Sequence, residues 1–212
     1  MSSLDQHEQE QVEAIKAWWK ENGKWLIGAV VVGLLGFSGT TYWKNHRLGQ
    51  EADAAKLFSE VERQVATNDA KRIGDAADAL VNRYGNSAYA PRAQLLAAQA
   101  SLQARDVAHA EVQLSWVIEH AGETDLQDAA RLKLASILLD EKKYDEALKQ
   151  LDAAHPESFT GLYADLRGDV LSAQGKIAEA RTAYQQAYDK TDAKDSYRNL
   201  IQLKLDGLGS AK

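Results

Sequence analysis

The sequence predicts an all-α protein, in which one N-terminal transmembrane helix is followed by a solenoid of paired helices and a C-terminal capping helix. Three observations support this prediction. Residues 25–43 form an apolar stretch without a single charge. The chain beyond Arg47 is rich in helix-forming residues and is interrupted about every 15 residues, which favours a series of helices. Small residues recur in that region at a nearly fixed interval, which is typical of helical repeats.

The composition excludes several classes of function. With 45% hydrophobic and 26% charged residues, the chain should form a packed core. A net charge of -6 and no basic cluster argue against a nucleic-acid partner. The absence of cysteine excludes disulfides and a thiol nucleophile. Because the histidines lack metal-ligand spacing and no phosphate-binding glycine loop or nucleophile elbow occurs, we expect no metal, no cofactor and no enzymatic activity.

The apolar stretch from Trp25 to Trp43 is predicted to cross a membrane. As a helix it is about 28 Å long, close to the roughly 30 Å hydrocarbon core of a bilayer. Trp25 at one end, and Tyr42 with Trp43 at the other, are expected as anchors at the lipid headgroups. A cleaved signal peptide fits poorly, because the preceding segment is acidic and the apolar run is too long. A buried soluble helix also fits poorly, since each glycine would weaken it by about 1 kcal/mol.

Small residues form one stripe along this helix, at Ala29, Gly33, Gly36 and Thr40. Their spacing of four, three and four positions places them on one face, where a second helix can approach closely in lipid. The alternative is that the stripe has no partner, because glycine is common in membrane helices.

Residues 1–24, ahead of the span, are predicted to form an amphipathic helix. Val12, Ile15, Trp18 and Trp19 lie on its apolar side, and charged residues lie opposite. This segment could contact membrane lipid, bind a protein partner, or simply extend the span. Basic residues flank the span equally on both sides, so the positive-inside rule leaves the orientation open.

Residues 51–212, which follow a short linker at 44–50, contain an internal repeat. In its clearest copy, five positions recur at one constant offset further along the chain. These are Ala135, Tyr144, Ala147, Leu151 and Ala154, which recur as Gly168, Ile177, Ala180, Tyr184 and Ala187. Two steps of similar length toward the N-terminus, from Ala147 to Ala110 and from Ala110 to Ala76, locate two further units, of which the earlier is degenerate in its first helix.

These spacings resemble the tetratricopeptide repeat, an antiparallel helix pair of about 34 residues with small residues where the helices cross. The early tryptophan and the regular proline of that repeat are missing. One such pair cannot bury its apolar face alone, and stacking solves this problem. A last helix, at about residues 192–205, is predicted to cap the stack.

The first helices of stacked pairs line a concave side, which commonly binds an extended peptide or a partner helix. The repeat register assigns a set of residues to this groove: Arg92, Gln99, Gln103, Ser136, Leu139, Asp165 and Asp169. For the two aspartates, a solvated charged face is the plain alternative.

Three short motifs carry a family resemblance that extends along nearly the whole chain. They are Glu-Gln-Val-Glu-Ala-Ile-Lys at residues 10–16, Glu-Asn-Gly-Lys at 21–24 and Ala-Asp-Leu-Arg-Gly-Asp at 164–169. With them, the chain resembles the ancillary SecYEG translocon subunits, YfgM-like proteins of the bacterial inner membrane. The middle repeats are similar in pattern more than in residues, so no contact residues can be transferred there.

The resemblance implies a single-pass inner-membrane protein with a cytoplasmic N-terminus and a periplasmic repeat domain. It also implies association with the SecYEG translocon and with a membrane-anchored periplasmic chaperone of the PpiD type. Such a protein would be a non-enzymatic adaptor that connects the channel exit to chaperones receiving exported polypeptides. The alternative is a membrane-anchored stress or envelope regulator that acts through its cytoplasmic tail.

Overall fold

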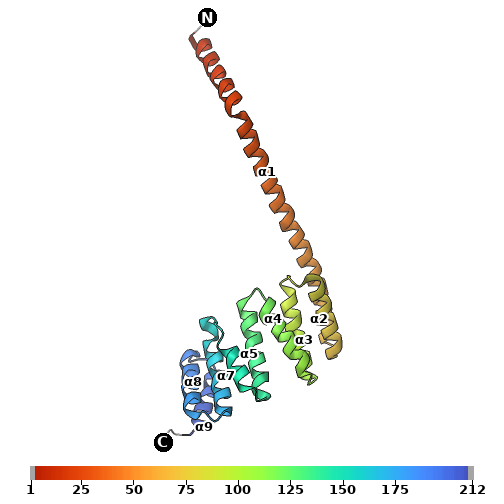
Figure 1. The fold of residues 1–212 in the computed structure, drawn as a ribbon, viewed down its shortest axis with the longest axis vertical. Helices are drawn as coiled ribbons and strands as arrows, with labels where there is room; N and C mark the ends of the chain where they lie inside the picture. The colour runs from red at the N-terminus through yellow and green to blue at the C-terminus, as the bar shows by residue number, and fades with distance from the viewer. Residues whose placement is uncertain (1–2, 210–212) are drawn as a thin grey trace. The chain divides into compact units, whose positions relative to one another are not determined.

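The computed structural model describes residues 3–209, and within this range it is helical without a strand. Most helices of the described residues are labelled in Figure 1, and their numbering follows the chain. Their bounds are α1 (Ser3–Val65), α2 (Ala70–Tyr84), α3 (Tyr89–Gln103), α4 (Val107–His120), α5 (Thr124–Asp140), α6 (Tyr144–Leu151), the 3-10 helix η1 (Glu157–Phe159), α7 (Thr160–Ala173), α8 (Ile177–Lys190) and α9 (Tyr197–Gly207). The predicted all-α class is therefore confirmed.

The chain divides into two compact units, Met1–Gln50 and Glu51–Lys212. In the first unit, the acidic tail, the apolar stretch and the short linker at 44–50 all belong to one uninterrupted helix, α1. No proline precedes Pro91, so nothing removes a backbone donor along α1. The ends of the two predicted ranges, residues 1–2 and 210–212, lie outside the described part.

The second unit is a stack of antiparallel helix pairs, and its first pair uses the end of α1. Ala54 and Val61 in this part of α1 are fully buried, and Val61 packs in one cluster with Ile73 of α2. The repeat unit around Ala76, whose first helix looked degenerate in the sequence, is therefore complete. Its first helix is the end of α1, the helix that also contains the apolar stretch. The pairs α3–α4, α5–α6 and α7–α8 follow in chain order (Figure 1).

The turn inside each pair has the same backbone conformation. Asn68, Arg105, Lys142 and Gly175 all have positive φ angles, between 54° and 78°. The steps from Arg105 to Lys142 and from Lys142 to Gly175 equal the steps between the last three repeat units in the sequence. At the last three turns, the helix end closes with the two backbone hydrogen bonds of a Schellman motif, for example Asp106 N to Ser101 O at 2.8 Å. The period seen in sequence is therefore a period in turn geometry as well.

The capping helix α9 begins at Tyr197, about five residues later than predicted from sequence. The delay has a local cause, because aspartate side chains bond to backbone N–H groups and compete with the helix. Asp192 accepts from the N–H of Lys194 at 2.8 Å, and Asp195 accepts from the N–H of Tyr197 at 2.9 Å.

Small residues lie where the two helices of a pair cross. Ala135 and Ala147 are fully buried at the α5–α6 crossing, and Ala180 is fully buried at the α7–α8 crossing. Gly168 lies opposite the ring of Tyr184, so close that a Cβ on Gly168 would come within 2.5 Å of the ring carbon Cδ1. The last pair therefore uses glycine where the preceding pair uses alanine, because an aromatic ring fills the space.

We expect Gly168→Ala to destabilise the repeat domain by about 1–3 kcal/mol, since the added methyl group overpacks the Tyr184 ring. Gly74→Ala is the matched control, because a Cβ there meets only Nε2 of Gln113, at 3.8 Å. The control should stabilise α2 by up to about 1 kcal/mol through helix propensity. Urea unfolding followed by circular dichroism measures both changes, and equal stabilisation by the two substitutions would contradict the crossing geometry.

Candidate partner-binding site

The anchor residues predicted from sequence lie on an exposed helix surface. Among the described residues, α1 is the one helix long and apolar enough to cross a membrane, and none of its apolar window is buried in the protein. Trp25, Tyr42 and Trp43 are strongly exposed. A Cβ built at Gly33 or Gly36 meets nothing within 4 Å, so the small-residue face is open.

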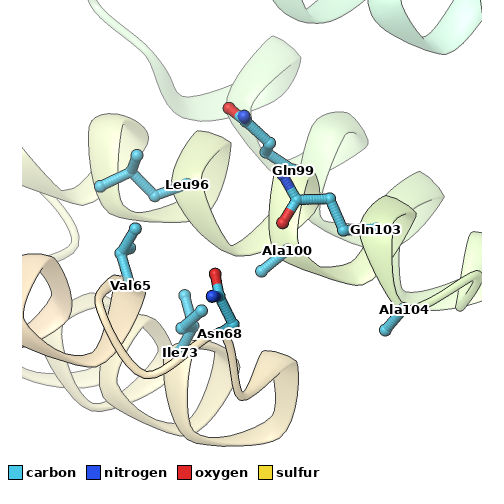
Figure 2. Close-up of a pocket in the computed structure, with 8 residues that line it drawn as sticks. All are labelled: Val65, Asn68, Ile73, Leu96, Gln99, Ala100, Gln103 and Ala104. Carbon is cyan, nitrogen blue, oxygen red and sulfur yellow. The ribbon is translucent and has the colours of Figure 1, made fainter.

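Two of the predicted groove residues, Gln99 and Gln103, lie together on one pocket of about 370 Å³. Val65 at the end of α1, Asn68 in the following turn and Ile73 on α2 line the same pocket (Figure 2). The left-handed turn at Asn68 reverses the chain between α1 and α2, and Asp69 caps α2 by accepting from the Arg72 N–H at 3.1 Å. The pocket therefore exists because this turn brings the first pair against α3.

The pocket has an apolar floor and an amide rim. Ile73 and Ala100 are almost completely buried at its floor, at 2% and 7% exposure. The amides of Asn68, Gln99 and Gln103 supply donors and acceptors around it, and none of the described residues that line it is charged. This arrangement suits an apolar side chain whose neighbouring peptide groups bond to the amides. The eight described residues that line it include no nucleophile and no acid–base pair.

Three predicted groove residues lie apart from this pocket. One guanidinium nitrogen of Arg92 donates to both carboxylate oxygens of Glu123, at 2.9 and 2.8 Å, and this ion pair ties α3 to the start of α5. Ser136 is exposed on α5. Leu139 is half-buried and packs against the central hydrophobic cluster.

Asp165 and Asp169 lie in a network formed with the C-terminal helix. The Lys204 ammonium contacts Asp165 at 2.7 Å and Asp169 at 2.8 Å. The Tyr197 hydroxyl donates to Asp165 at 2.6 Å, and the Tyr184 hydroxyl donates to Asp169 at 2.7 Å. Asp165 is only 3% exposed. Both carboxylates are therefore engaged by the protein's own cap.

Sequence reasoning missed the other members of this network, although one signal was present. Lys204 falls between Ile201 and Leu205, which are both buried, so it lies on the apolar face of α9. A lysine on a core-facing stripe needs a buried acidic partner. The Asp165 and Asp169 pair supplies it.

The pKa values of three groups in this network, Tyr184, Tyr197 and Lys204, are all raised in the folded chain. Burial is the largest cause that raises the pKa values of Tyr184 and Tyr197, and their bonds to the carboxylates raise them further. For Lys204, burial by itself lowers the pKa, but the hydrogen bonds to Asp165 and Asp169 outweigh it and the net pKa is raised. All three groups therefore keep their protons more strongly when the chain is folded.

Because these pKa values are raised on folding, the network stabilises the fold fully below the unfolded tyrosine pKa, and this contribution is lost as pH rises above about 10. We expect the free energy of unfolding to fall with pH in this range, accompanied by cooperative appearance of tyrosinate absorbance. In the double variant Tyr184→Phe, Tyr197→Phe, the free energy of unfolding should fall less steeply with pH. Part of the fall that remains should come from Tyr163, whose pKa is also raised by burial. Identical alkaline slopes in the two proteins would contradict this assignment.

Comparison with known proteins agrees with this architecture. The Tetratricopeptide repeat-like domain family matches residues 16–210. A protein named "Ancillary SecYEG translocon subunit" from Neisseria gonorrhoeae is 34% identical over 95% of this chain and 97% of that relative. Proteins of the same name from Escherichia coli and Haemophilus influenzae are 29% and 27% identical, over 96% and 95% of this chain and 97% of each relative. No solved structure matches the chain. The resemblance found in the short motifs is confirmed, and the chain belongs to the ancillary SecYEG translocon subunit family, with a tetratricopeptide repeat-like domain.

Proposed function

We propose that this protein is a non-enzymatic, membrane-anchored subunit of the SecYEG translocon that holds PpiD-type periplasmic chaperones near the channel exit. The observation that carries the proposal is the 34% identity, over 97% of its length, to a relative named as an ancillary subunit of that translocon. The exposed apolar part of α1 supports an anchor in the bacterial inner membrane. In this arrangement the tail before Trp25 is cytoplasmic, and the repeat domain is periplasmic.

The anchor would contact a neighbouring transmembrane helix through one seam. The small-residue stripe is in register with three apolar residues and one asparagine before the span, since consecutive members of the series are separated alternately by three and four positions. This is the heptad spacing of two helices packed side by side. The seam runs through Val12, Ile15, Trp19, Asn22, Leu26, Ala29, Gly33, Gly36 and Thr40. Outside the span, Ile15 is 66% exposed and Trp19 is 51% exposed, so this part of the seam also lacks cover in the described chain.

The pocket beside Gln99 and Gln103 would hold a polypeptide segment of the chaperone or of an exported protein. Its apolar floor and uncharged amide rim accept an apolar side chain together with peptide groups, independent of a particular sequence. A site of this kind suits an adaptor that meets many different chains.

A second candidate function is an envelope-stress regulator that acts through the cytoplasmic tail. The observation that favours it is the exposure of Trp18 and Trp19, each 51%, on a segment that precedes the span. Exposed tryptophans are frequent anchors of protein interfaces. In this case the tail, rather than the pocket, would carry the functional contact.

Photo-crosslinking in native membranes tests the proposal. A photoreactive residue at Gly36 should capture a SecYEG subunit, and one at Gln99 should capture a periplasmic chaperone. Matched probes at Val31, on the opposite face of α1, and at exposed Val112, on α4, should capture much less of either protein. Deletion of residues 2–20 should leave the capture from Gln99 unchanged. Capture of neither channel nor chaperone would overturn the proposal, and loss of both captures on deletion of the tail would favour the regulator.

A further inference from the structure

A second pocket, of about 500 Å³, lies between α2 and α4 at the end of α3. Small residues make room for it, because Ala70, Gly74 and Ala104 all line it. A Cβ on Gly74 would meet only the amide nitrogen of Gln113. The hollow is therefore open down to this amide.

The floor of this pocket carries a buried polar side chain, Gln113. It is only 8% exposed, and the Ser101 hydroxyl fixes its orientation by donating to its Oε1 at 3.0 Å. Within the part of the chain that the structure describes, its Nε2 makes no hydrogen bond. The pocket leaves this N–H accessible, so it can donate to an acceptor that enters the pocket.

The rim of the pocket carries an excess of negative charge. Lys71 pairs with Asp75 at 2.8 Å, so these two charges balance. Asp78 and Asp106 remain, which leaves two negative charges from three carboxylates and one lysine. The hydrogen bond from His109 lowers the pKa of Asp106, so this carboxylate is ionised at neutral pH.

Asp78, the other rim carboxylate that Lys71 does not pair with, has one oxygen that is available to a ligand. Asp78 accepts a hydrogen bond from Gln94 on Oδ1 at 2.9 Å, and among the described residues nothing donates to its Oδ2. Asp78 and Gln113 line the same pocket, so this oxygen and the amide N–H offer one ligand both an acceptor and a donor. A peptide unit with a cationic side chain provides the complementary pair.

We propose that this pocket binds an arginine of a partner polypeptide. The guanidinium lies between Asp78 and Asp106, where its planar set of N–H donors suits carboxylate oxygens. The backbone carbonyl of the bound residue accepts from Nε2 of Gln113. This site goes beyond the proposed function, since it selects a basic residue, whereas the pocket beside Gln99 has no charge with which to do so.

Titration of the full-length protein in detergent micelles with N-acetyl-arginine amide, followed by NMR, tests the proposal. The side-chain amide protons of Gln113 should shift and saturate. N-acetyl-citrulline amide has the same shape without the charge, and it should bind about tenfold more weakly. Agmatine keeps the guanidinium but has no backbone carbonyl, so it should leave the Gln113 amide protons unshifted.

Two matched substitutions locate the charge effect. Asp78→Asn keeps an oxygen for Gln94 but removes the charge, and it should weaken binding about fivefold. Asp125→Asn, at an exposed aspartate on α5, should leave binding unchanged. Equal binding of the arginine and citrulline probes, unchanged binding in Asp78→Asn, or a Gln113 amide that does not respond would each overturn the proposal.

Discussion

Burial of apolar helix faces between neighbouring pairs is the constraint on which the repeat domain depends. A single pair of short helices exposes one apolar face, so each pair is stable only against the next. Among the residues that the structure describes, the buried ones accordingly form three clusters in series rather than one central core. Trp116 packs against both the first and the second of them along the chain, and Leu148 packs against both the second and the third. These two side chains make the stack continuous.

The apolar face at each end of such a stack must also be covered, and the protein covers its two ends in different ways. At the start, the last part of α1 supplies the missing first helix, with Val61 fully buried against α2. At the finish, α9 covers the last pair, and Lys204 bridges Asp165 and Asp169. The polar bridge favours this position of the cap, because a shift of α9 would take the half-buried lysine away from both carboxylates. The contacts that occur once therefore lie at the two ends of the stack, and the contacts that repeat from pair to pair lie in its interior.

The features that follow from local sterics could be predicted from the sequence. The helix crossings demand small residues, so Ala135, Ala147 and Ala180 revealed the repeat and its period. The placement of Asp165 and Asp169 could not be predicted, because their register assigns them to the inner helix face, while the cap that engages them comes from much further along the chain. In the first pair, the unit around Ala76 was found but its first helix looked degenerate, since that helix is continuous with an apolar segment of different composition. Long-range packing, rather than propensity, decides both cases.

The central structural claim is that the repeat stack begins inside α1, and native-state hydrogen exchange tests it most directly. Residues 54–65 should exchange with the same opening free energy as α2 and α3, because these helices share one apolar cluster. The substitution Val61→Ala should then accelerate exchange in α2 as well as in α1. Fast exchange of residues 54–65 with full protection of α2, before and after the substitution, would contradict the account.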